Sequence, residues 1–124
     1  MSATSTTRVA ALVPEEQVSV FQEALSVEGV KVVHAADPNA AATTASVILC
    51  DADSKDGWPG MMPQILDRQP KARVILMSRL ADERMWVEAL NAGAHDLLAK
   101  PCPQQALCAA VRSALQLRWQ PQAA

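Results

Sequence analysis

Short apolar runs recur along this chain, and each is interrupted after a few residues by a polar, charged or proline residue. Runs of this length that are rich in Val, Ile, Leu and Ala are typical of strands buried on both faces, as in parallel sheets. Between these runs the apolar positions recur every three or four residues, which indicates helices. The pattern predicts strands at residues 9–13, 31–35, 46–50, 73–77 and 96–99.

Residues with known capping roles mark the starts of the predicted helices. Asp37 followed by Pro38 suits a helix cap and the first helical position, and Asp82 suits a second cap. Residues 58–60 read Trp-Pro-Gly and are expected to be loop, so that the helix after the third strand begins at Met61. Strands and helices alternate five times, which predicts an α/β fold: a doubly wound five-stranded parallel sheet with helices on both faces.

Size and composition limit the classes of protein that this chain can be. Its 124 residues fit one domain at 8–119, with a disordered segment at 1–7 and a tail at 120–124. A net charge of −2 offers no attraction to nucleic acid, and no apolar stretch approaches the roughly 18 residues of a membrane span. The start lacks a signal-peptide pattern, and three cysteines without metal-ligand spacing suggest buried, reduced thiols. We therefore expect a cytoplasmic protein that binds neither nucleic acid nor membrane.

Polar residues follow three of the predicted strands. Asp51 comes directly after the third strand, Ser78 after the fourth and Lys100 after the fifth. The carboxyl ends of parallel strands line one edge of the sheet, so these three side chains are expected to converge. They supply a nucleophilic carboxylate, a hydroxyl donor and a cation suited to a phosphoryl group. The sequence therefore predicts phosphoryl chemistry at this edge, although each residue alone also suits a turn, a helix cap or the solvated surface.

Residues 8–117 resemble the receiver domain of bacterial response regulators. The family's phosphoacceptor strand, its fourth strand with a terminal Ser or Thr, and its Gly-Ala-x-Asp-Tyr-Leu-x-Lys-Pro segment match residues 47–51, 74–78 and 93–101.

The resemblance implies a role for each of the three polar residues. Asp51 is expected to be the phosphoacceptor, Ser78 the switch hydroxyl and Lys100 the phosphate-binding lysine. The cofactor would be Mg²⁺, and the partner a sensor histidine kinase or phosphotransfer protein. The protein would then be a signalling switch rather than a turnover enzyme.

The chain departs from the family at the expected metal site. The family places two acids at the end of the first strand, but this chain has Val13 and Pro14 there. Glu15 and Glu16 follow at once and are candidate ligands, although acids in a first turn also suit the helix dipole. Asp53 is a further candidate beside Asp51, or else a solvated turn residue.

A candidate interaction face involves the fourth helix, the fifth strand and the fifth helix. With Met85, Ala89 and Leu90 toward the sheet, Trp86 turns about 100° away and is expected to be partly exposed. The family's switch aromatic is Leu97 here, which cannot swing a ring between buried and exposed positions. In the family this face mediates dimerisation or output binding, so Trp86, Leu97 and Arg112 are candidates for a homodimer or partner contact; alternatively Trp86 covers its own helix.

Three functions remain open. The first is a receiver that accepts a phosphoryl group on Asp51 and switches its protein interactions. The second is a pseudo-receiver, which keeps the fold and works as an interaction domain without phosphorylation. The third is a phosphatase, because Asp51-Ala52-Asp53 resembles the Asp-x-Asp motif of haloacid-dehalogenase-type enzymes, although no acid follows Lys100.

Overall fold

The computed structural model describes residues 7–53 and 57–118, with side chains up to residue 115. Most of the segment expected to be disordered, the C-terminal tail and Trp119 lie outside these residues, whereas Thr7 is the first residue of a strand. The elements, in chain order, are β1 (Thr7–Leu12), η1 (Glu15–Gln17), α1 (Val18–Leu25), η2 (Ser26–Glu28), β2 (Val30–His34), α2 (Pro38–Thr44), β3 (Val47–Asp51), α3 (Trp58–Arg68), β4 (Arg73–Ser78), α4 (Glu83–Asn91), β5 (Asp96–Ala99) and α5 (Gln104–Arg118).

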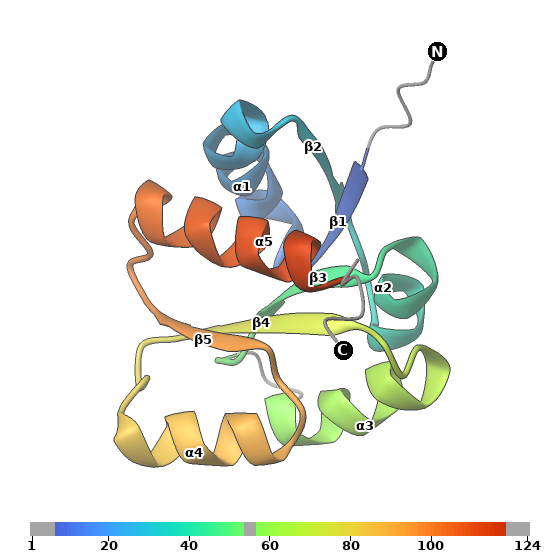
Figure 1. The fold of residues 1–124 in the computed structure, drawn as a ribbon, viewed down its shortest axis with the longest axis vertical. Helices are drawn as coiled ribbons and strands as arrows, with labels where there is room; N and C mark the ends of the chain where they lie inside the picture. The colour runs from blue at the N-terminus through green and yellow to red at the C-terminus, as the bar shows by residue number, and fades with distance from the viewer. Residues whose placement is uncertain (1–6, 54–56, 119–124) are drawn as a thin grey trace, which may run out of the picture.

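The strands form one parallel sheet in the order β2-β1-β3-β4-β5, as Figure 1 shows. β3 lies in the middle, and all five of its residues are buried. Its side chains alternate between two apolar clusters, Val47 and Leu49 on one face and Ile48 and Cys50 on the other. The doubly wound five-stranded sheet predicted from the alternation of elements is therefore confirmed.

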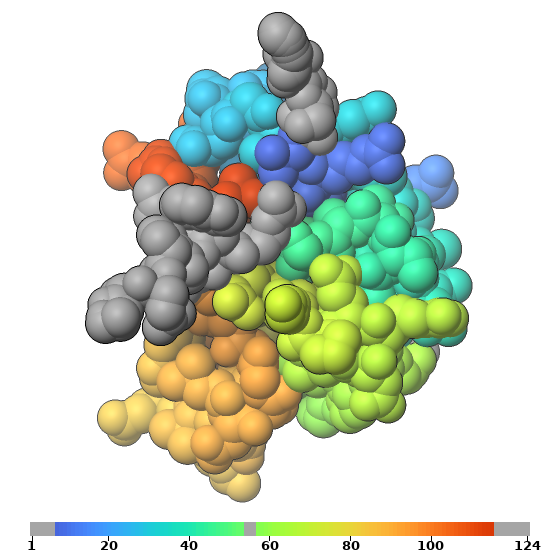
Figure 2. All heavy atoms as spheres, turned by 45° about the vertical axis from the view of Figure 1, so that its right-hand side comes forward, coloured from blue at the N-terminus to red at the C-terminus, as the bar shows by residue number. Residues whose placement is uncertain are grey.

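Helices cover both faces of this sheet. Helices α1 and α5 lie on one face, and α2, α3 and α4 on the other (Figure 1). Helices α2 and α3 pack side by side on one flank, visible in green and lime in Figure 2. Among the helices of the described residues, none combines the length and apolarity needed to cross a membrane.

Two helix starts follow the capping chemistry expected from the sequence. The Asp37 carboxylate accepts a hydrogen bond from the Ala40 N–H at 2.8 Å at the start of α2, with Pro38 as the first helical residue. Asp82 likewise accepts from the Met85 N–H at 2.8 Å at the start of α4. Each contact satisfies one of the N–H groups that a helix leaves without a partner in its first turn.

Some boundaries differ from the prediction. Helix α3 begins at Trp58 rather than at Met61, because Gly57 takes a left-handed φ of 76° and lets the helix start with proline in its first turn. The first helical segment is divided into η1, α1 and η2, and it ends at Gly29 with φ 71°. Asp51 and Ser78 are the last residues of their strands rather than the first of the following turns.

The three cysteines are free thiols in different surroundings. Cys50 and Cys108 are buried as expected, but Cys102 is only half-buried, because it lies in the segment between β5 and α5. Burial raises the pKa of the Cys50 thiol to about 12, and the neighbouring Asp51 charge adds to the effect. Cys50 is therefore a core residue rather than a nucleophile.

Candidate functional site

The carboxyl edge of the sheet brings the three polar residues predicted from the sequence together. Asp51 ends β3, Ser78 ends β4 in the neighbouring position, and Lys100 follows β5. The Lys100 ammonium donates to Asp51 Oδ1 over 2.7 Å, and the Lys100 N–H donates to the Ser78 carbonyl over 3.0 Å. Asp51 and Ser78 are the two buried polar residues of the described chain, 5% and 1% exposed. The site is thus built on rigid strand ends.

Among the described residues, the Asp53 carboxylate accepts as many hydrogen bonds at this edge as the Asp51 carboxylate does, two each. Asp53 Oδ1 accepts from the Ser78 hydroxyl at 2.7 Å, and its Oδ2 accepts from the Arg79 N–H at 3.0 Å. The Lys100 ammonium lies 3.2 Å from the same Oδ2. The sequence predicts Asp53 only as a metal ligand or a solvated turn residue. The structure instead places its carboxylate between the hydroxyl and the ammonium.

A single ammonium is shared between two carboxylates. The Asp51, Asp53 and Lys100 side chains retain 8%, 17% and 24% of their exposure, so solvent screens the charges only in part. Desolvation works against the charged form of Lys100, but hydrogen bonds to Asp51 and Asp53 outweigh it and raise the lysine pKa. Desolvation likewise opposes the charged form of Asp53, and the donors from Arg79, Ser78 and Lys100 outweigh it, which lowers the Asp53 pKa. Both shifts favour the charged forms of Lys100 and Asp53 at neutral pH.

The network continues into the turn between β4 and α4. The Leu80 N–H donates to Ser78 Oγ at 2.9 Å, while the Ser78 hydroxyl donates to Asp53. On the other side, the Asp53 N–H donates to Asp51 Oδ1 at 2.9 Å. The first residues after β3 and after β4 are therefore held to one another through Asp53.

The described residues do not fit the Mg²⁺ ion that the resemblance implies. Such an ion needs near-octahedral oxygen coordination, with one or two carboxylates as anchors. Val13 and Pro14 supply no side-chain oxygen, and Glu15 and Glu16 are exposed in η1, where neither makes a hydrogen bond or ion pair with a described residue. No cluster of three or more His, Cys, Asp or Glu in the described part of the chain could hold a metal.

An apolar hollow of about 230 Å³ lies at the end of β1 instead of an acidic site. It is lined by Leu12, Val13, Pro14, Ala35, Ala36, Asp37, Pro38 and Met61. The two available carboxylates, Asp51 and Asp53, are already engaged by Lys100.

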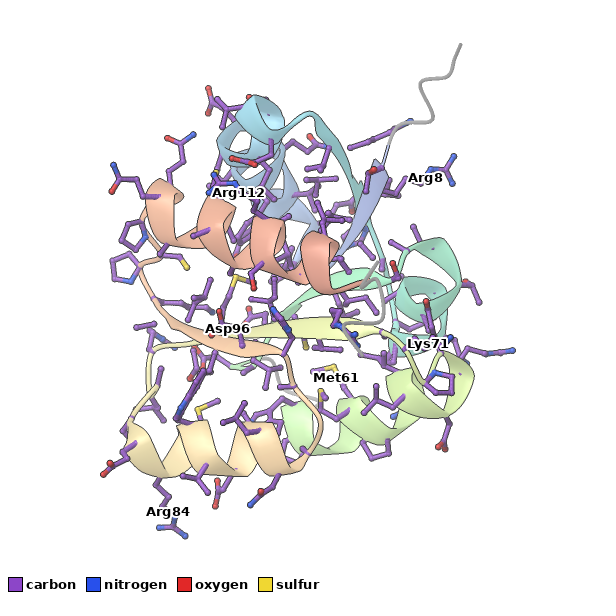
Figure 3. The ribbon with its side chains drawn as sticks, viewed as in Figure 1. Arg8, Met61, Lys71, Arg84, Asp96 and Arg112 are labelled. Atoms are coloured by element: carbon purple, nitrogen blue, oxygen red, sulfur yellow. The ribbon has the colours of Figure 1, made fainter. Side chains whose placement is uncertain are left out.

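The predicted interaction face is only partly assembled. Trp86 is 38% exposed and lines one surface hollow together with the buried Leu97. Leu90 points outward at 44% exposure rather than toward the sheet, and Val87 is also exposed, so α4 presents an apolar strip. Arg112 does not join this face: it forms a two-point ion pair with Glu28 of η2, at 3.2 and 2.8 Å, on the α1 side of α5 (Figure 3).

A parallel five-stranded α/β fold with a buried aspartate, a serine and a lysine at consecutive strand ends defines the class of receiver domains. The model of the response regulator receiver domain family matches residues 14–112, and the chain belongs to that family. Receiver domains are generally signalling domains rather than enzymes.

Solved structures agree on the fold. The beryllofluoride-activated DrrB receiver domain aligns with a TM-score of 0.75 at 21% identity, covering 90% of this chain and 98% of that one. The chemotaxis protein CheY4 of Vibrio cholerae gives 0.75 at 16% identity, with 89% and 99% covered. The beryllofluoride-activated NtrC4 receiver domain dimer gives 0.77 at 22% identity, with 90% and 98% covered. A comparison with curated protein sequences gave no match.

Proposed function

We propose that this receiver domain acts as a pseudo-receiver, a signalling module whose protein contacts do not depend on phosphorylation of Asp51. The observation that carries the proposal is the lack of a fit for Mg²⁺: apolar residues stand at the end of β1, and both nearby carboxylates are held by Lys100. The working partners would be cytoplasmic proteins of a two-component pathway.

The electrostatics of the edge support this proposal. Phosphoryl transfer depends on positive charge, usually from a metal ion, that stabilises the transferring group. Here Asp51 and Asp53 together carry two negative charges against the single positive charge of Lys100. The Arg79 guanidinium, 79% exposed and 3.6 Å from Asp53, adds only a screened contribution. An incoming phosphoryl group would therefore meet a net negative edge.

The phosphoacceptor function is the second candidate, and one observation favours it. Asp51 is almost fully buried at the end of β3, with Lys100 at 2.7 Å, so a nucleophilic carboxylate and a phosphate-pairing cation are both in place. In that case a sensor histidine kinase or a phosphotransfer protein would supply the phosphoryl group, and Mg²⁺ would be drawn from solution.

A phosphodonor experiment decides between these two functions. Incubation with acetyl phosphate and Mg²⁺ should label wild-type protein roughly 10²–10³-fold more slowly than a receiver domain that has both acids, because the missing metal site is worth several kcal/mol of transition-state stabilisation. Intact-mass spectrometry measures the +80 Da adduct, a mass fixed by the added phosphoryl group, with Asp51→Asn as the control. Labelling of wild type at the ordinary receiver's rate, lost in Asp51→Asn, would establish the phosphoacceptor instead.

The strip on α4 is the proposed contact for a second copy or for an output protein. A half-exposed tryptophan beside exposed aliphatic residues is typical of interface hot spots. Trp86→Ala should leave the free energy of unfolding within about 1 kcal/mol of wild type, as surface substitutions do, while it weakens self-association in analytical ultracentrifugation.

The matched control is Val20→Ala on α1, which is 62% exposed and lies on the opposite face of the sheet. It should change neither quantity. A large loss of stability in Trp86→Ala with unchanged association would show that Trp86 supports the core instead of a contact.

A further inference from the structure

We propose that the Asp53 carboxylate is a built-in anion that stands where a phosphoryl group would bind, and that it holds the turn between β4 and α4 in an anion-bound arrangement. The inference deepens the proposed function and rests on it, because a pseudo-receiver leaves the phosphate-binding donors without a phosphoryl group.

Three kinds of donor from two segments, the end of β4 and the end of β5, meet on the two Asp53 oxygens. They are the Ser78 hydroxyl at 2.7 Å, the Arg79 backbone N–H at 3.0 Å and the Lys100 ammonium at 3.2 Å. A hydroxyl, a backbone N–H and an ammonium are the groups that proteins use together for a phosphoryl oxyanion. The carboxylate of Asp53 thus satisfies a complete anion-binding set.

The chain geometry explains why Asp53, of all the acids, reaches this position. It lies two residues beyond Asp51, and the intervening Ala52 donates its N–H to the Met77 carbonyl at 2.9 Å. The Asp53 N–H donates to Asp51 Oδ1 at 2.9 Å. These two contacts fold the turn back over the end of β4 and deliver the carboxylate to Ser78. Such a tethered anion acts at an effective concentration in the millimolar range or above, which a free ion must exceed to displace it.

The arrangement has a consequence for the neighbouring surface. Ser78 accepts from the Leu80 N–H, and the Asp82 N–H donates to the Leu80 carbonyl at 2.8 Å. Asp82 caps α4, and the same turn and helix contribute Ala81, Asp82, Glu83 and Trp86 to the hollow that also contains Leu97. Asp53 therefore fixes, through the Ser78 hydroxyl, the conformation of the turn that leads into α4 and its proposed contact strip. The contact strip on α4 would then keep one arrangement permanently instead of being switched by phosphorylation.

Removing the built-in anion should open a site for a free one. In Asp53→Ala, sulfate should bind with at least about tenfold higher affinity than in wild type, because the Ser78 hydroxyl and the Arg79 N–H then lack a charged acceptor and Lys100 contacts Asp51 alone. ¹H–¹⁵N NMR titration follows the Arg79 and Leu80 amides, with sodium chloride at equal ionic strength as reference. These amides should shift in the variant and return toward their wild-type positions as sulfate saturates.

The matched control is Asp67→Ala, an exposed acid of α3 without a hydrogen bond or ion pair to a described residue, which should titrate like wild type. If Asp53→Ala does not fold, Asp53→Asn retains the volume and removes the charge. Its Arg79 amide proton should then move upfield, since a charged acceptor makes the stronger bond. Unchanged Arg79 and Leu80 amides, or absence of saturable sulfate binding in Asp53→Ala, would overturn the inference.

The readout separates this inference from the proposed function. Rapid phosphorylation of wild type by acetyl phosphate refutes the pseudo-receiver. The sulfate titration then still tests, independently, whether Asp53 occupies the anion site. Slow phosphorylation together with an unresponsive Asp53→Ala refutes the built-in anion and leaves the pseudo-receiver standing.

Discussion

Replacing Lys100 by methionine should lower the free energy of unfolding by about 3 kcal/mol, the low end of the range for removing one partner of a buried ion pair. Lys100 is the ammonium that contacts both Asp51, at 2.7 Å, and Asp53, at 3.2 Å. Methionine keeps the apolar stem, but it leaves two largely buried carboxylates without their shared cation. Urea denaturation measures the loss of unfolding free energy. We expect the low end of the range for a buried ion pair because the lysine side chain keeps 24% of its exposure.

Two further variants test the cause of this loss. Lys71→Met makes the same chemical change at an exposed residue that points away from the domain (Figure 3), and it should stay within about 0.5 kcal/mol of wild type. Adding Asp51→Asn to Lys100→Met removes one of the stranded charges, so the double variant should recover part of the stability. Equal effects of Lys100→Met and Lys71→Met would show that the carboxylates do not depend on the lysine.

The architecture was predictable because its signals are local. Each buried strand is a short apolar run. Asp37 and Asp82 each cap a helix by accepting a hydrogen bond from the N–H only three residues further along the chain. The parallel arrangement then places the strand ends on one edge, which is why Asp51, Ser78 and Lys100 were found from the sequence.

The role of Asp53 was not predictable in the same way. Its carboxylate is positioned by donors 25 and 47 residues further along the chain, and no local pattern encodes which of a loop's carboxylates reaches them. The signal present in the sequence was indirect: a second acid two residues after Asp51, combined with the missing acids at Val13 and Pro14.

The side of a helix on which a residue lies was also difficult to predict from the sequence. Arg112 is expected from the sequence on the face formed by the fourth helix, the fifth strand and the fifth helix, but its partner Glu28 lies 84 residues away in η2 and holds it on the α1 side of α5. Leu90 was assigned to the sheet, whereas Ala89 alone on that turn is fully buried. A difference of one residue rotates a helical side chain by about 100°, so small errors in phase change the surface that is inferred.

Leu49→Ala should lower the free energy of unfolding by about 3–4 kcal/mol, because it removes a fully buried side chain from the central strand and leaves a cavity. Leu49 belongs to the cluster between the sheet and helices α1 and α5, two residues before Asp51. For a domain of this size the loss corresponds to a decrease in Tm of roughly 12–25 °C, measurable by circular dichroism.

The matched control for this core substitution is Leu90→Ala, the same truncation on α4 at a side chain that is 44% exposed. It should cost less than about 1 kcal/mol, since most of the removed surface is already in water and alanine favours the helix. The difference between the two truncations isolates the contribution of burial beneath the site. Equal losses of unfolding free energy in the two variants would contradict this expectation. They would show that the apolar layer under Asp51 does not hold the strand ends, or the charges of Asp51, Asp53 and Lys100, in position.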